Sequence, residues 1–161
     1  MIRRRRMFSI LPFFYARKTL RIQSLLEGGR MGKYGEAAVL ATECYLNAGA
    51  DSPVAAWKIA THRVFPKPAG QNKCCPKGAY LGLCEEGLVK GVPPGRYTRS
   101  KDNKFYALEA WRALQSQPGL VDDQTCLWAK ARGTKHIKHN EQMDVVTALW
   151  RRGLLHRNQS R

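Results

Sequence analysis

Apolar residues recur every three or four positions along most of the chain, which is the spacing that places them on one face of an α-helix. A first stretch of this kind covers residues 34–48. A second begins at Ser52, a residue type that caps helices, continues with Pro53 at the first helical position, and stops before Pro66. The pattern therefore predicts two helices between residues 34 and 65.

Four further stretches have the same period and are bounded by residues that start and stop helices. Their predicted starts are Pro76, Asp102 or Asn103, Asp122 or Asp123, and Asn140, and their predicted ends are Gly87, the residue before Pro118, Gly133 and Gly153, in that order. Glycine directly after a helix closes its last turn in the left-handed conformation. The chain is thus expected to contain five or six helices.

Residues 89–100 form the one segment without helical character. Pro94 with Gly95 suits the centre of a type II turn, so we expect a short hairpin or an extended loop here. The fold class that follows is all-α. We expect a single compact domain over residues 31–155, a basic extension before it, and a polar tail at 156–161.

A short pattern occurs twice in the chain. Leu83, Gly87 and Leu88 are repeated 66 residues later by Leu149, Gly153 and Leu154. Each copy follows a basic loop and a helix with a tryptophan, Trp57 in the first and Trp128 in the second. Either a helix–loop–helix unit has been duplicated, or two amphipathic helices with glycine ends are simply alike. Two copies fall short of the three or so units of a repeat architecture.

Composition places the chain among globular proteins, with 43% hydrophobic and 9% aromatic residues in 161 positions. No apolar run approaches the ~18 residues of a membrane-spanning helix. Charge is more informative, because 28 Lys and Arg stand against 12 Asp and Glu, a formal net charge of +16. Residues 1–30 contribute eight cations and one acid (+7), and residues 31–161 contribute twenty and eleven (+9). Such a protein attracts polyanions, nucleic acid first and an anionic membrane surface second.

The first thirty residues are rich in arginine and contain a single acid, Glu27. The interpretation that we favour is an upstream start codon, with the functional chain beginning at Met31. A mitochondrial presequence has a similar composition and is the next alternative, followed by a membrane-surface anchor. The expected location is cytoplasmic, or mitochondrial only if the segment is a genuine presequence.

Five cysteines cannot all pair, and two of them, Cys74 and Cys75, are adjacent, so the pattern favours a reducing compartment. The possible metal donors are His62, Cys74, Cys75 and Cys84, or His136 and His139. Zinc sites usually contain a Cys-x2-Cys pair, which is missing, and adjacent cysteines chelate one tetrahedral zinc poorly. We therefore expect no metal and no cofactor.

Basic residues gather on the loops that precede predicted helices, where the positive end of the helix dipole adds to their charge. The predicted nucleic-acid-binding residues are Lys73, Lys77, Lys90, Arg96, Arg99, Lys101 and Lys104, and a second basic loop carries Lys130, Arg132, Lys135, His136, Lys138 and His139. The aromatic residues Tyr97, Phe105 and Tyr106 lie among them and could stack on bases, although helical spacing favours core packing.

Two more specific interpretations find little support in the sequence. A winged helix would need a short turn between its helices, whereas Pro66 to Cys75 is far longer than three or four residues. No catalytic signature is present, and the one candidate for a reactive thiol is Cys75, which stands before Pro76 at a helix start. The enzyme question stays open, with the balance toward a non-catalytic protein.

Two alternatives to nucleic-acid binding remain. One is a protein-interaction or regulatory module that uses an exposed face of Trp and Leu residues. The other is a small enzyme or ligand-binding domain, with a pocket near residues 90–106 lined by Lys90, Tyr97, Asn103, Lys104 and Tyr106. Partners, whether nucleic acid or protein, and the oligomeric state do not follow from the sequence.

Five segments of the chain resemble a bacterial domain family of unknown function. They are Tyr34 to Ala38, Lys73 to Cys84, Gly87 to Val92, Asn103 to Ala107 and His139 to Val146. The resemblance covers about residues 33–155 and omits the first thirty. It implies a small basic helical protein of the bacterial cytoplasm, and because the family has no assigned activity it supplies no functional residues.

Overall fold

A computed structural model describes residues 31–157, and the expectations for residues 1–30 and for the tail from 158 onward lie outside the described residues. The described part is helical: α2 (Lys33–Leu46), α3 (Pro53–Val64), the short α4 (Pro68–Gln71), α5 (Cys74–Glu85), α6 (Lys101–Ser116), the 3-10 helix η1 (Pro118–Asp122), α7 (Gln124–Arg132) and α8 (Gln142–Arg151). Within residues 31–157 no strand forms, and the all-α prediction is confirmed. No helix in this part of the chain is long and apolar enough to cross a membrane.

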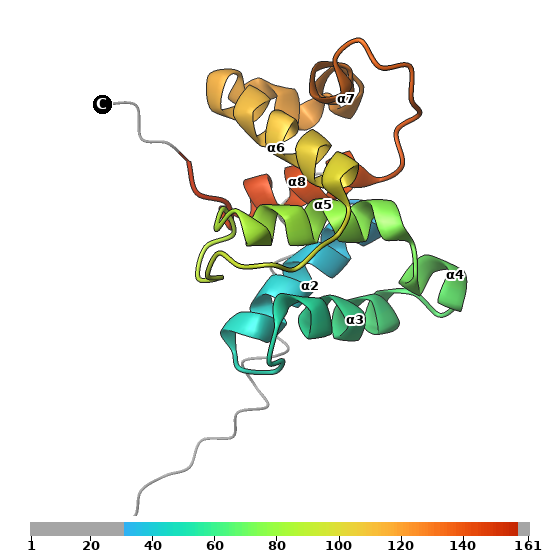
Figure 1. The fold of residues 1–161 in the computed structure, drawn as a ribbon, viewed down its shortest axis with the longest axis vertical. Helices are drawn as coiled ribbons and strands as arrows, with labels where there is room; N and C mark the ends of the chain where they lie inside the picture. The colour runs from blue at the N-terminus through green and yellow to red at the C-terminus, as the bar shows by residue number, and fades with distance from the viewer. Residues whose placement is uncertain (1–30, 158–161) are drawn as a thin grey trace, which may run out of the picture. The chain divides into compact units, whose positions relative to one another are not determined.

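The two central helices are α5 and α8, with α2 and α3 on one side of them and α6 and α7 on the other (Figure 1). Their buried faces supply much of the core, including Tyr80, Leu83 and Leu149. The ring of Trp57 on α3 stacks on Tyr80 with centroids 5.1 Å apart. The apolar residues whose spacing predicted the helices therefore pack together in one continuous core.

Four of the helices point in the same direction. At their starts, Asn140 beside α8 contacts Cys75 of α5, Gln142 of α8 contacts Asn103 of α6, and Gly32 before α2 lies against Asp144 of α8. At the other end, the segments that leave α5 and α8 pair with each other, and the C-terminal part of α6 is bonded to the segment after α8. The helices α2, α5, α6 and α8 thus start at one end of the molecule, which we call the N-terminal end.

The duplication suggested by the sequence has a structural counterpart. The order α2, α3, α5 is repeated by α6, α7, α8, with Trp57 on the middle helix of the first unit and Trp128 on that of the second. Packing is reciprocal, because α2 packs on α8 of the second unit and α6 packs on α5 of the first. In each of the two three-helix units the first helix thus packs on the last helix of the other unit.

The repeated glycine pattern lies where the two units join. Gly87 and Gly153 have φ of 67° and 66°, and the following Leu88 and Leu154 each donate a backbone hydrogen bond to the helix they leave. After these caps, residues 89 and 155 form an antiparallel bridge. Both predicted glycine caps are therefore present, and the two segments pair with each other.

Two of the predicted N-terminal caps are present and two are absent. Ser52 Oγ accepts from Ala55 N at 3.1 Å, and Asp123 Oδ1 accepts from Cys126 N at 2.9 Å. The caps predicted at Asp102 or Asn103 and at Asn140 were wrong, because α6 begins at Lys101 and the residue before α8 is Glu141. The side chains of Asn103 and Asn140 bond to residues far away in the sequence instead.

The segment between α5 and α6 is extended, as one of the two alternatives predicted, and runs back along α5 (Figure 1). The predicted type II turn is absent because Gly95 does not have the positive φ that this turn requires, whereas Gly91 has φ of 76°. The carboxylate of Glu85 accepts from Thr98 N at 3.1 Å and from Tyr97 N at 3.3 Å. The Glu85 carboxylate thus satisfies two backbone N–H groups that, in a sheet, would bond to a neighbouring strand.

The hydrogen bonds that Glu85 accepts are expected to make the stability of this segment depend on pH. Burial raises the pKa of the Glu85 carboxyl, but the bonds from Thr98 and Tyr97 and the nearby Lys104 outweigh it, so the pKa is lowered. A carboxyl whose pKa is lower in the folded chain than in the unfolded chain stabilises the fold at pH values above its unfolded-state pKa. That stabilisation is lost as the pH falls through its folded-state pKa. Glu85→Gln is therefore expected to lower the free energy of unfolding by about 1 kcal/mol at pH 7.

This difference should shrink as pH falls below 4.5, the ordinary value for glutamate. Urea unfolding at pH 7 and at pH 3.5 measures it. Glu43→Gln is the control on α2 and should change neither value. If Glu85→Gln lowers the free energy of unfolding by the same amount at both pH values, the ionised carboxylate is not what holds the segment.

Candidate functional site

The N-terminal end gathers the starts of α2, α5, α6 and α8. None of the residues that precede these four helices caps the helix with its side chain, in contrast to Ser52 and Asp123 at the starts of α3 and α7. Each helix start has unsatisfied backbone N–H groups and about half a positive charge. Four of them side by side make this end of the fold attractive to anions.

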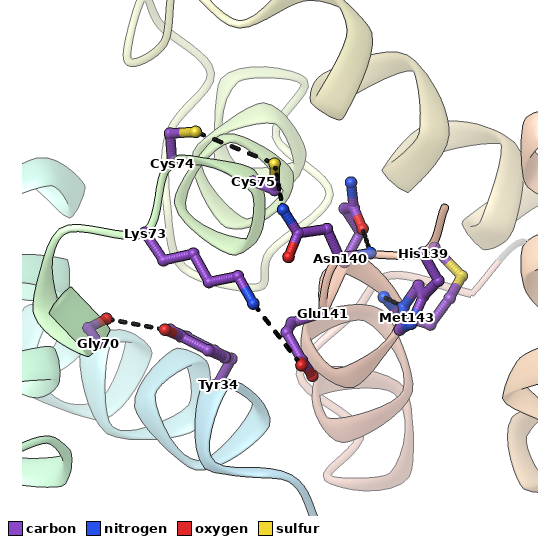
Figure 2. A network of polar contacts seen from close by, with 10 residues as sticks. Tyr34, Gly70, Lys73, Cys74, Cys75, His139, Asn140, Glu141 and Met143 are labelled. Carbon is purple, nitrogen blue, oxygen red and sulfur yellow. Dashed lines mark hydrogen bonds and ion pairs between the residues drawn. The ribbon is translucent and has the colours of Figure 1, made fainter. Parts of the chain in front are cut away.

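Polar side chains connect three of the helix starts, and Figure 2 shows the contacts between those of α5 and α8. Asn140 Nδ2 donates to Cys75 Sγ at 3.1 Å, and Gln142 Nε2 donates to Asn103 Oδ1 at 2.9 Å. Lys73 Nζ lies 3.7 Å from Glu141. Three of the segments on which the family resemblance rests, Lys73 to Cys84, Asn103 to Ala107 and His139 to Val146, thus meet at this end.

The cation of Lys73 also reaches α2. Its Nζ lies 5.4 Å from the centre of the Tyr34 ring, and the Tyr34 hydroxyl donates to Gly70 O at 2.9 Å. Burial, followed by the charge of Glu141, raises the pKa of Tyr34. The second unit has a similar contact, since Lys135 Nζ lies 5.5 Å from the ring of Tyr106 on α6.

The loop that leads into α8 is held by His139. The backbone N–H of Met143 donates to His139 Nε2 at 3.0 Å, which satisfies one of the free N–H groups of α8, and the other ring nitrogen is left as the donor. Desolvation lowers the pKa of His139, and Glu141 opposes this shift. The ring also contacts Trp128, with centroids 5.3 Å apart.

Beside this contact is an open, shallow depression of about 410 Å³. It is lined by Trp128, Arg132, His136, Ile137, Lys138 and His139.

Two carboxyl groups lie next to each other on the first turn of α8. Glu141 has φ of 68°, the left-handed region, and Asp144 is half-buried. Burial raises the pKa of Asp144 and the neighbouring Glu141 raises it further, while a hydrogen bond from Gln124 lowers it. At the positive end of a helix these carboxyls neutralise part of the charge that would otherwise face solvent.

The predicted cations fall into three groups. Lys73 and Lys104 are paired with carboxylates, Lys73 with Glu141 and Lys104 with Glu85 and Glu86. Lys77 lies on the first turn of α5, Lys101 begins α6 and Arg99 precedes it on the extended segment, whereas Lys90 and Arg96 lie nearer the end of α5. These five have no ion-pair partner among residues 31–157. The structure thus brings only part of the predicted set together.

The three pocket candidates do not share a location. Tyr97 packs near the end of α5 and donates its hydroxyl hydrogen to Pro93 O, Asn103 lies at the N-terminal end, and Tyr106 is buried against Trp128. Phe105, in contrast, is 46% exposed, with Lys135 Nζ 5.6 Å from its ring centre. The aromatic residue best placed to stack on a base is therefore Phe105.

All five cysteines are free thiols. Burial raises the pKa of Cys84 to about 12, so this thiol is a core residue. Burial also raises the pKa of Cys75, while hydrogen bonds from Asn140 and Asn103 lower it. Among the described residues, no three His, Cys, Asp or Glu side chains are placed to hold one metal ion.

Sequence reasoning missed the polar residues that join the helix starts, Gln142 and Glu141 above all. Gln142 is buried on a helix whose apolar period it interrupts, and that interruption was the available signal. Its partner, Asn103, could not be identified, because the two residues are 39 positions apart. The role of His139 as an acceptor for α8 likewise has no local motif.

Comparison with known proteins gives one match. A model of a family of unknown function, DUF6979, matches residues 31–156, which is the whole described domain except one residue. No curated protein and no solved structure matches the chain. With more than half of its length matched, the chain belongs to this family of unknown function, DUF6979.

Proposed function

We propose that the protein binds nucleic acid without catalysis, and that the phosphate backbone lies across the N-terminal end. The observation that carries the proposal is the meeting of four helix starts beside the exposed or half-exposed cations Lys77, Arg99 and Lys101. Backbone N–H groups at helix starts and lysine or arginine side chains are the groups that most often contact phosphate. The carboxylate of Glu141 offsets the charge of Lys73, with which it is paired, and leaves Lys77, Arg99 and Lys101 without an ion-pair partner among residues 31–157.

The surroundings of these cations favour a nucleic acid over a single small anion. Lys135 and Lys138 stand on the loop that leads into α8, and Lys135 reaches α6, where its Nζ lies 4.0 Å from Asp102. Lys135 Nζ also lies 5.6 Å from the ring centre of Phe105, whose ring is partly exposed. Cations that follow a backbone, with an aromatic ring beside them, are typical of single-strand binding. A nucleic-acid partner and five free cysteines are in keeping with the cytoplasm of a bacterium.

The test uses a triple variant, Lys77→Ala with Arg99→Ala and Lys101→Ala. Its affinity for single-stranded DNA and RNA is expected to be lower by about 30-fold near 50 mM salt, because three phosphate contacts are lost. The slope of log affinity against log salt should fall by about 2, since each contact contributes about 0.7 for a single strand. Fluorescence anisotropy across a salt series gives both quantities.

The matched control removes three exposed cations elsewhere: Lys58→Ala with Lys90→Ala and Arg96→Ala. Its net charge equals that of the test variant, so any effect of total charge appears in both. Both triples are made in the full chain and in a chain that begins at Met31, so that binding by the fold is separated from any contribution of the four consecutive arginines at 3–6. Equal losses in the two triples, or no binding by the chain from Met31, would reject the proposed surface.

A further inference from the structure

Cys74 and Cys75 open α5 at the N-terminal end, and their sulfur atoms are 3.9 Å apart (Figure 2). Cys74 is exposed and Cys75 is half-exposed, so solvent reaches the pair. We propose that these two thiols form an open binding site for one soft, thiophilic divalent cation of the zinc and cadmium class. The two sulfurs would hold the ion, and its remaining positions would stay open to water or to an exogenous ligand.

The separation of the sulfurs supports a bridging ion. Zinc–sulfur bonds are about 2.3 Å long, so an ion bound equally to two sulfurs 3.9 Å apart subtends an angle of about 116°. That angle lies between the tetrahedral and the trigonal values, and the pair needs little movement to reach either. A direct disulfide is less favourable, because adjacent Cα atoms are about 3.8 Å apart and disulfides prefer at least about 4.4 Å.

Burial raises the pKa of the Cys75 thiol, but a hydrogen-bond donor stands beside its sulfur and can hold it in position once a metal ion has displaced the proton. Asn140 Nδ2 donates to Cys75 Sγ at 3.1 Å. Donors of this kind orient and stabilise metal-bound sulfur. The start of α5 adds its positive partial charge, which stabilises thiolates. In the absence of an ion, burial keeps the Cys75 thiol protonated by raising its pKa.

The binding step balances without an oxidant or a reductant. Each thiol loses its proton to solvent and donates a sulfur electron pair to the ion, so one divalent cation and two thiols give one neutral dithiolate complex and two protons. The described residues supply no third His, Cys, Asp or Glu ligand. The proposed site therefore has two protein ligands, in contrast to a structural zinc site with four. An ion held by only two ligands can exchange with solvent.

The experiment titrates the reduced full chain with Cd²⁺ and follows the ultraviolet sulfur-to-cadmium charge-transfer band. Wild type is expected to saturate at one ion per chain. Cys74→Ser and Cys75→Ser should each weaken binding about 100-fold, because one thiol alone loses the benefit of chelation. Asn140→Ala should weaken it about 10-fold through the orientation of Cys75. Cys44→Ser and Cys126→Ser, which change other half-exposed thiols, should leave the titration unchanged.

A second measurement uses only the wild-type protein, so it does not depend on whether the variants fold. Alkylation of wild type by iodoacetamide, located by mass spectrometry, should slow at Cys74 and Cys75 when Cd²⁺ is present and stay unchanged at Cys44 and Cys126. Equal protection of all thiols, a saturation ratio of one ion to two chains, or no charge-transfer band at millimolar Cd²⁺ would each overturn the proposal. None of these readouts involves nucleic acid, so the outcome is independent of the proposed function.

Discussion

Leu149→Ala is expected to lower the free energy of unfolding by about 3–5 kcal/mol. Leu149 stands on the central helix α8 with 0% of its side chain exposed, so truncation removes buried carbon and leaves a cavity. Because the two three-helix units pack reciprocally, Leu83 on α5 is its counterpart and is also 0% exposed. Leu83→Ala should therefore lose a similar amount.

Urea denaturation measures both losses. Leu46→Ala serves as the matched control, because this leucine is 47% exposed at the end of α2 and its truncation should change stability by less than about 1 kcal/mol. If truncation of Leu83 or Leu149 lowers the free energy of unfolding as little as truncation of Leu46, the two units do not contribute equally to stability.

Gly35→Leu is expected to be nearly as damaging, at about 3 kcal/mol. A Cβ atom at Gly35 would lie 2.7 Å from Ala148 Cβ and 2.8 Å from the backbone oxygen of Asp144. Both are fixed parts of α8, so α2 must move away from it, and the lost packing outweighs the better helix propensity of leucine. A similar close approach occurs where α5 meets α6, since a Cβ at Gly82 would lie 2.7 Å from Lys104 Cα.

The control for this prediction is Gly119→Leu. Nothing lies within 4 Å of a Cβ at Gly119, and its φ is not in the left-handed region, so leucine fits without a clash. Thermal unfolding of the two variants should differ by at least several degrees for a domain of this size. A Gly35→Leu protein as stable as Gly119→Leu would show that α2 and α8 separate easily.

Local structure was largely predictable from the sequence, because its signals are local. The helix periods, the capping residues Ser52 and Asp123 and the left-handed glycines at 87 and 153 all agree with the structure. The errors occur where a polar side chain has a better partner elsewhere. Asn140 was assigned to cap α8, but its amide bonds to Cys75, 65 positions away. The turn at Gly95 failed for a similar reason, since Glu85 holds the next residues extended.

The candidate site was predictable only in its charge. The sequence correctly indicated that basic loops precede helices. Whether the starts of those helices meet depends on the direction in which each helix runs. That direction depends on α3 and α7, the middle helices of the two units, which carry the chain back. Lys73 and Lys77 therefore lie at one end of α5 and Lys90 beyond the other, although the three residues look alike in the sequence. The pairing of Lys104 with Glu85 and Glu86 also depends on helices crossing in space.

The reciprocal packing of the units has a consequence for synthesis on the ribosome. Because α2 packs on α8, the first described helix has to wait for the last one, about one hundred residues later, before its buried face is covered. The first unit cannot close on itself while the second is still being translated, since α5 likewise needs α6. Contacts between such distant segments slow folding relative to a simple bundle. The nascent chain thus exposes apolar helix faces until α8 emerges, and a chain cut short before that point leaves uncovered the face of α2 that packs on α8.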